Sequence, residues 1–109
     1  MIIRYLAVAA LAALPLVSHA QLSAEGEQAK ARLFKCYGES IVQLDDGVSD
    51  VTTVARAVVS TCQAEFDNFI YSVVSGNRRV DVQEVSRRVK EGHVEMIVPS
   101  LLKLRAGTL

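Results

Sequence analysis

Two cysteines lie at equal distances from the clearest turn in the chain. Cys36 and Cys62 are the only cysteines, and the point midway between them lies within Asp45-Asp46-Gly47-Val48-Ser49-Asp50. Gly47 can adopt the left-handed conformation that ends a helix, and Ser49 or Asp50 can cap the next one. Two antiparallel helices joined here would bring the cysteines together. Because the two cysteines would meet across the hairpin, and because the N-terminal pattern described below predicts export to an oxidising compartment, we expect a Cys36–Cys62 bond.

The apolar residues on both sides of this turn recur every three or four positions, as they do on one face of a helix. The first segment contains Leu33, Cys36, Tyr37, Ser40, Ile41 and Leu44, and the second contains Val51, Val54, Val58, Cys62, Phe66, Phe69 and Val73. Folding the two helices together predicts contacts of Leu44 with Val54, of Ser40 and Ile41 with Val58, and of Leu33 with Phe66. A further stripe in the second helix, from Ala55 to Val74, predicts a third packing partner.

That partner is predicted to begin after Asp81, which can cap a helix while Glu84 reaches back to complete a capping box. Its expected apolar stripe is Val82, Val85, Val89, Gly92 and Met96. Gly92 would allow a neighbouring helix to approach closely, and Pro99 is expected to interrupt the helix. Residues 100–105 are expected to add one or two helical turns, and residues 106–109 are expected to fray. The predicted fold is all-α: residues 21–105 form a disulfide-linked antiparallel helical hairpin with a third helix, a small three-helix bundle.

The N-terminus has the pattern of a secretory signal peptide. A basic start at Arg4 precedes an apolar run from Tyr5 to Val17, and small residues stand at Ser18 and Ala20. We therefore predict that residues 1–20 are removed before Gln21 and that the protein is periplasmic or secreted. The alternative is a retained N-terminal anchor, although the run is short for a bilayer span of about 20 residues.

The charge pattern argues against nucleic acid as a partner, since the formal net charge is zero and nucleic-acid binders usually carry a strongly basic surface. The C-terminal part is nevertheless basic, with a cluster of Arg78, Arg79, Arg87, Arg88 and Lys90. The cluster is interpreted as a solvated helix face, and a face that binds anionic lipid or another envelope polyanion is the alternative.

Residues that could support catalysis or metal binding are sparse. Asp45, Asp46 and Asp50 do not fit an EF-hand, because position twelve counted from Asp45 is Arg56 rather than a carboxylate. His93 is the only histidine after residue 20, and Glu91 and Glu95 would point to other faces of its helix. We therefore expect no enzyme activity, no metal and no cofactor.

The segment from Val94 to Leu104 is richer in large apolar residues than one helix stripe can bury. It predicts a surface for an envelope protein or a second copy of the chain, with a membrane surface as the alternative. The candidate partner-binding residues are Met96, Val98, Leu101, Leu102 and Leu104.

The stretch from Cys36 to Cys62 resembles a group of small exported bacterial proteins that share a signal peptide and two cysteines around a short acidic turn. The resemblance is carried by Leu44-Asp45-Asp46-Gly47, Ser49-Asp50, Thr53-Val54-Ala55 and the closing Cys62. It implies the hairpin architecture and no functional site.

The sequence therefore predicts a non-catalytic exported protein that binds another envelope protein or itself. An inhibitor or immunity protein against a toxin acting in the envelope is one form of this hypothesis, by analogy of fold alone. The alternative function is binding to a membrane surface or an envelope polymer through the basic C-terminal part.

Overall fold

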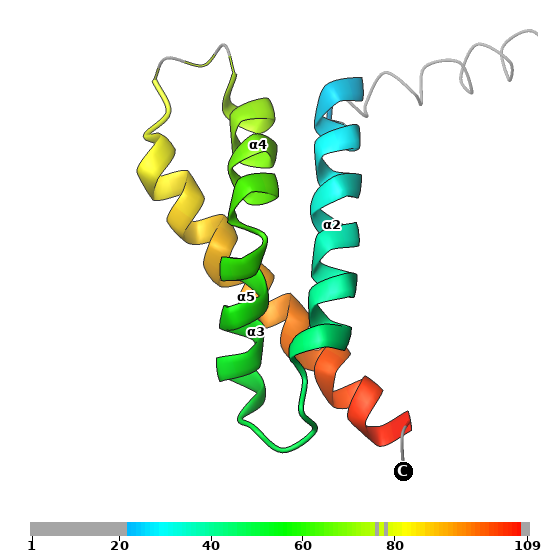
Figure 1. The fold of residues 1–109 in the computed structure, drawn as a ribbon. Coiled ribbons are helices and arrows are strands. Elements are labelled where there is room, and N and C mark those ends of the chain that lie inside the picture. The colour runs from blue at the N-terminus through cyan, green and yellow to red at the C-terminus, as the bar shows by residue number, and fades with distance from the viewer. Residues whose placement is uncertain (1–21, 76, 78, 108–109) are drawn as a thin grey trace, which may run out of the picture.

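Helix α2 (Ala24–Leu44) forms the first arm of the fold in the computed structural model, which describes residues 22–75, 77 and 79–107 (Figure 1). The Ser23 side chain caps α2 by accepting a hydrogen bond from the Gly26 N–H at 3.1 Å. The buried face recurs every three or four residues and consists of Gly26, Ala29, Leu33, Tyr37 and Ser40. The predicted signal peptide, residues 1–20, lies outside the described residues.

The turn after α2 has the predicted chemistry. Gly47 has a φ of 75°, a left-handed conformation that glycine adopts without strain. Asp50 caps helix α3 (Val51–Thr61) by accepting a hydrogen bond from the Thr53 N–H at 3.1 Å. The chain therefore reverses where the sequence predicts, and α3 runs back along α2 (Figure 1).

The second arm is two helices rather than the single one expected. Helix α3 is followed by α4 (Gln63–Val74), and Cys62 stands between them with φ −98° and ψ 27°. These angles lie away from the helical values of about −63° and −42°. The prediction of a continuous helix fails at the residue that is covalently tied to α2.

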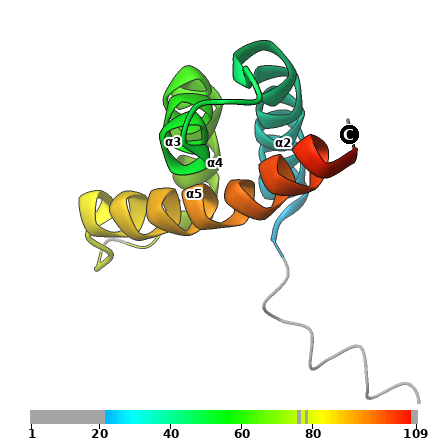
Figure 2. The same ribbon diagram turned by 90° about the horizontal axis from the view of Figure 1, so that it is seen from below.

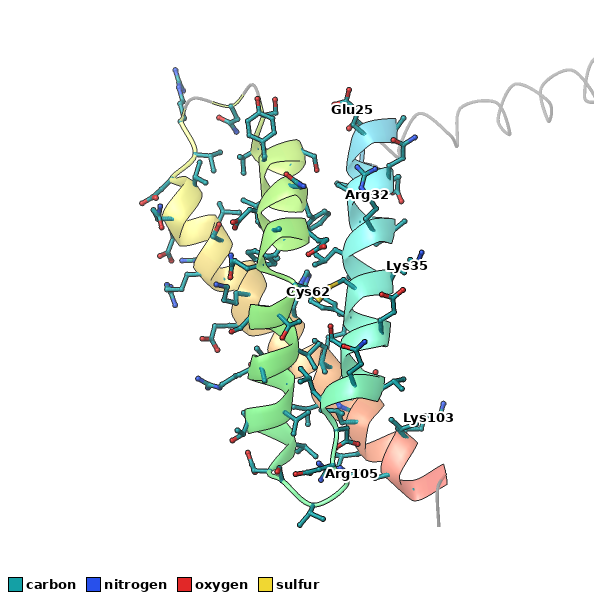
Figure 3. The ribbon with its side chains drawn as sticks, viewed as in Figure 1. Glu25, Arg32, Lys35, Cys62, Lys103 and Arg105 are labelled. Atoms are coloured by element: carbon teal, nitrogen blue, oxygen red, sulfur yellow. A yellow bond between two sulfur atoms is a disulfide. The ribbon has the colours of Figure 1, made fainter. Side chains whose placement is uncertain are left out.

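The disulfide joins the two arms near their middle, as predicted. Cys36 and Cys62 are bonded, with their Cα atoms 5.9 Å apart. The Ser40 hydroxyl lies 3.4 Å from the Cys62 sulfur, to which it can donate a hydrogen bond. Figure 3 shows the bond bridging α2 and the junction of α3 with α4.

Helix α5 (Val82–Gly107) runs without interruption through Pro99, contrary to the expectation that this proline breaks it. A proline within a helix removes one backbone hydrogen bond, but Ile97 and Leu101 are buried on either side of Pro99 and hold both segments in place. The expected fraying at 106–109 is also wrong for 106 and 107, which are helical, whereas 108 and 109 lie outside the described residues.

Helix α5 crosses the two arms as a second layer (Figure 2). Because it crosses obliquely, its buried stripe is not the predicted one: Val94, Ile97 and Leu101 enter the core, and Val85 and Val89 pack against it. Val82 and Met96 are exposed. A Cβ atom at Gly92 would meet nothing within 4 Å, so this glycine is not a point of close helix approach.

The core lies between the two layers and confirms the all-α hairpin with a third helix packed against it. It contains Leu33, Tyr37, Val54, Ala55, Val58, Val59, Cys62, Phe66, Ile70, Val94, Ile97 and Leu101. The arm formed by α3 and α4 is therefore buried on two sides, as its two apolar stripes predict. Leu44, predicted to pack on Val54, is exposed instead. Among the helices of residues 22–107 that are described, none is long and apolar enough to cross a membrane.

Candidate functional site

The candidate partner-binding residues do not form one surface. Leu101, predicted to be available for a partner, is completely buried and belongs to the core. Val98 is partly buried against the core. Because α5 remains helical across Pro99, these residues share the helix face that packs on the core. The prediction was wrong for Leu101 because it placed a helix break at Pro99.

The three exposed candidates divide between two sides of α5. Met96 and Leu104 are eight residues apart, so they lie on one flank of the helix with Ser100 between them. Leu102 is two residues from Leu104 and lies on a different flank. Leu102 and Leu104 are 52% and 42% exposed, respectively. The apolar surface predicted from the sequence is therefore divided between two flanks of α5.

One of these flanks adjoins the end of α2. Ile41 and Val42 line an open cleft of about 320 Å³ together with Leu104 and the turn residues Asp45, Asp46, Gly47 and Arg105. Val42 is 75% exposed. We name the surface formed by Ile41, Val42 and Leu104 the α2–α5 edge. Ile41 also packs against the core, as predicted, whereas Val42 was not predicted as a surface residue, although it falls outside the apolar stripe of its helix.

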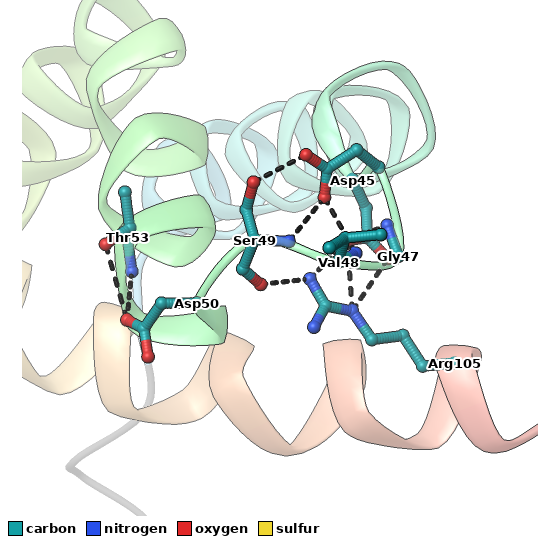
Figure 4. Close-up of polar contacts among 8 residues, drawn as sticks. Asp45, Gly47, Val48, Ser49, Asp50, Thr53 and Arg105 are labelled. Atoms are coloured by element: carbon teal, nitrogen blue, oxygen red, sulfur yellow. Dashed lines mark hydrogen bonds and ion pairs between the residues drawn. The ribbon is translucent and has the colours of Figure 1, made fainter.

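An ion pair borders this cleft and fastens α5 to the turn (Figure 4). The Arg105 guanidinium donates to the Asp45 carboxylate at 2.7 Å and to the Ser49 carbonyl oxygen at 2.6 Å. The hydrogen bonds from Arg105 lower the pKa of the Asp45 carboxyl below its ordinary value. Arg105 is the basic residue in the last turn of α5, but no local pattern in the sequence identifies Asp45 as its partner.

The other two turn carboxylates are also engaged in hydrogen bonds. Asp46 accepts hydrogen bonds from the Val48 and Ser49 N–H groups at 2.9 and 2.7 Å, and these bonds together with the Ser49 hydroxyl lower its pKa. Asp50 caps α3. The prediction that Asp50 can cap the helix after the turn is confirmed.

The basic cluster is dispersed along and around α5. Arg87 and Arg88 both pair with Glu84, at 2.7 and 2.8 Å. Arg79 is exposed in the loop before α5, and Arg78 lies outside the described residues. The Asp81 carboxylate caps the helix by accepting from the Glu84 N–H at 3.2 Å. The Glu84 side chain pairs with the arginines rather than completing the expected capping box.

Lys90, the last member of the basic cluster, contributes to the packing of α5 on α4. Its ammonium donates a hydrogen bond to the Gln63 side-chain oxygen at 3.0 Å. The same group lies 5.5 Å from the centroid of the Phe66 ring, where a cation is attracted to the π-electrons. Lys90 thus links two helices, and it is not simply part of a solvated surface.

His93 is half-buried at the boundary of the core, and its ring is hydrogen-bonded. Its Nδ1 atom lies 2.8 Å from the Tyr37 hydroxyl oxygen. Burial lowers the pKa of His93 and raises that of Tyr37. Sequence reasoning missed this pair because Tyr37 and His93 belong to helices that are distant in the chain.

A possible metal-ligand grouping among the described residues is Cys36, Cys62 and Glu65, whose ligand atoms lie within 4.8 Å of one another. The two sulfur atoms are bonded to each other, so neither is a thiolate that could bind a cation. The arrangement is a crosslink beside a carboxylate.

Comparison with known proteins gives no information about what these surfaces bind. The chain matches no protein-family model, no curated protein and no solved structure. The resemblance to small exported bacterial proteins therefore stays a prediction.

Proposed function

We propose that this protein is a non-catalytic binding protein of the cell envelope, which associates with another envelope protein or a second copy of itself through the α2–α5 edge. The observation that carries the proposal is the exposure of Val42 and Leu104 on the wall of a cleft after all the described helices have packed. Large apolar side chains around a concave surface are typical of sites that bury their area against a partner.

Two further features support this function. The disulfide is compatible with an oxidising compartment, as expected of an exported protein. His93 is hydrogen-bonded to Tyr37, whereas a catalytic histidine of a serine hydrolase is paired with a serine and a carboxylate. Inhibition of a toxin or another envelope protein remains a concrete form of the proposal.

The alternative, a membrane-surface or envelope-polymer binder, is supported by Lys103, which lines a hollow next to Leu104. Arg105 also lines this edge, but it is paired with Asp45, and the residues of the basic cluster are distant from the edge along the helix. Arg88 and Leu104 are separated by about 24 Å at 1.5 Å per residue. A membrane-binding surface needs cations around its apolar residues, and the separation of the two sets favours a protein partner.

The test compares two leucines on different flanks of α5. Leu104→Lys places a charge on the α2–α5 edge, and Leu102→Lys places the same charge on another flank. We expect wild-type protein and Leu102→Lys to form the same complex, either a dimer in sedimentation velocity or a defined complex recovered from envelope extracts. We expect Leu104→Lys to lose it, while circular dichroism shows equal helical content for all three proteins.

The opposite result would identify a different surface. Loss of the complex in Leu102→Lys alone would place the interface on the other flank of α5. Binding of the wild type to vesicles containing phosphatidylglycerol, but not to phosphatidylcholine vesicles, would favour the membrane alternative. A monomeric wild-type protein that associates with neither proteins nor vesicles would contradict the proposal.

A further inference from the structure

His93 lies where three helices meet. It is carried by α5, and four aromatic rings surround its imidazole. The ring centroids of Phe34 and Tyr37 on α2 lie 5.9 and 5.6 Å away, and those of Phe66 and Phe69 on α4 lie 5.8 and 6.1 Å away. We name these five residues the histidine cluster. It joins α5 to both arms of the hairpin through one titratable side chain.

The hydrogen bond within the cluster suits a neutral imidazole. Tyr37 is buried, and burial raises the pKa of its hydroxyl, so the hydroxyl keeps its proton. It can therefore donate to an unprotonated Nδ1 of His93 at the observed 2.8 Å. A protonated imidazole has no acceptor nitrogen, so the tyrosine proton would have to turn away and find another acceptor in a buried site.

The cations near the cluster come from two of its helices. On α2, the Lys30 ammonium lies 5.8 Å from the centroid of the Phe34 ring. On α5, the Lys90 ammonium lies 5.5 Å from that of the Phe66 ring. Each ammonium therefore stands beside a ring that contacts His93, and neither supplies the negative charge that would stabilise a protonated imidazole.

The nearby carboxylates do not compensate for a charge on His93. On α4, the Glu65 carboxylate is next to the cysteine sulfurs, and the Asp67 carboxylate accepts from Gln63. On α5, Glu91 and Glu95 are two residues away on either side and lie on other helix faces. Within the described residues, His93 forms no ion pair.

We propose that the histidine cluster is an acid-sensitive lock, in which protonation of His93 loosens the packing of α5 against α2 and α4. This inference depends on the fold alone and is independent of whether the α2–α5 edge binds a partner. The lowered pKa of His93 has burial as its cause and agrees with the geometry.

The sign of the pH effect follows from linkage. In the unfolded chain, His93 has its ordinary pKa of about 6.5. As the pH falls from that value through the lower pKa of the folded state, the unfolded chain binds more protons than the folded protein. The lock is therefore fully effective above the ordinary pKa and loses its contribution in this acidic window. Below the folded-state pKa, the loss reaches a plateau.

The experiment follows His93 directly by NMR in the exported protein, whose start is first determined by mass spectrometry. If it begins at Gln21, His93 is the only histidine and its Cε1–H signal is unambiguous. We expect it to titrate below about 6.5, and hydrogen exchange in α5 to accelerate more than in α3 between pH 7.5 and 5. A titration at or above the ordinary value would overturn the proposal.

Two variants separate a lock from a merely structural histidine. His93→Phe keeps a ring in the cluster but cannot be protonated, so its Tm should fall less than that of the wild type between pH 7.5 and 5. Tyr37→Phe removes the hydroxyl that favours the neutral imidazole, so the His93 titration should move upward. An equal fall of Tm in His93→Phe and wild type would refute the lock. If His93→Phe does not fold, the wild-type titration and the Tyr37→Phe shift decide.

Discussion

The helical hairpin and helix α5 are held in the fold by different means. The hairpin of α2 with α3 and α4 has a covalent bond between Cys36 and Cys62 near its middle. Helix α5 depends on buried apolar side chains, on the histidine cluster and on the Arg105–Asp45 ion pair. Helix α5 is therefore the part of the fold that a substitution or acidification should release first.

The largest expected effect comes from removing a core contact of α5. Leu101→Ala should destabilise the protein by about 2–5 kcal/mol, toward the upper end because Leu101 is completely enclosed and its cavity cannot collapse easily. The matched control is Leu102→Ala, since Leu102 is half-exposed one position along the same helix and should change the stability by about 0.5 kcal/mol or less.

Urea denaturation of the two variants measures this difference. If the comparison between the hairpin and α5 is right, Leu101→Ala should also accelerate hydrogen exchange in α5 more than in α2. Equal destabilisation by the two alanine variants would contradict the placement of Leu101 in the core.

Removing the covalent link should have the next largest effect. Cys36→Ala combined with Cys62→Ala should cost about 3.5 kcal/mol, the loop-closure entropy for a separation of 26 residues at 25 °C. The loss should be the same at pH 7.5 and pH 5, because the bond does not titrate. Thermal denaturation at the two pH values, with circular dichroism before heating, measures the loss and the remaining helical content.

Thiol labelling of the native wild-type protein is the control for this experiment. Two freely labelled cysteines would show that the crosslink is absent in the native protein. In that case no covalent bond would hold the hairpin, and there would be no reason to expect it to be more stable than the packing of α5.

The hairpin could be predicted from the sequence because its determinants are local and symmetrical. Gly47 and Asp50 define the turn, and equal spacing from it brings Cys36 and Cys62 together. The prediction failed for the continuity of the second helix, because helical periodicity continues through Cys62 and does not reveal a change in its backbone angles.

The packing of α5 could be predicted only in part. Its start at Asp81 has a local capping signal, but the orientation of its buried stripe depends on the angle at which it crosses the hairpin. That angle places Leu101 in the core and leaves Met96 exposed. The contacts of His93 with Tyr37 and of Arg105 with Asp45 join residues distant in the sequence. Neither has a local signal that identifies its partner.

The smallest expected effects come from neutralising one of two carboxylates, Asp45 or Glu84. Which substitution lowers the Tm more tests whether α5 depends on contacts with other parts of the fold. The Arg105–Asp45 pair joins α5 to the turn, and its side chains are 21% and 7% exposed. Glu84 pairs with Arg87 and Arg88 on its own helix, in solvent. We expect Asp45→Asn to lower the Tm more than Glu84→Gln does, in thermal denaturation at pH 7 and low salt.

The pKa values alone would suggest a strong effect for Glu84, since its two arginines lower the pKa of its carboxyl to about 2. For both groups the folded-state pKa lies below the ordinary value, so their contributions exist at neutral pH and disappear as the pH falls through the folded-state pKa. Exposure reduces what the Glu84 pairs contribute to stability, because water and salt screen them and adjacent turns can form them in partly unfolded chains.

At 1 M salt the screening length is about 3 Å, so the Tm difference between Glu84→Gln and the wild type should vanish. The Asp45→Asn difference should persist, because that pair is shielded from solvent and Arg105 also bonds the Ser49 carbonyl. If salt abolishes both differences equally, the Arg105–Asp45 contact is only a surface pair, and α5 is held by its apolar residues and the histidine cluster.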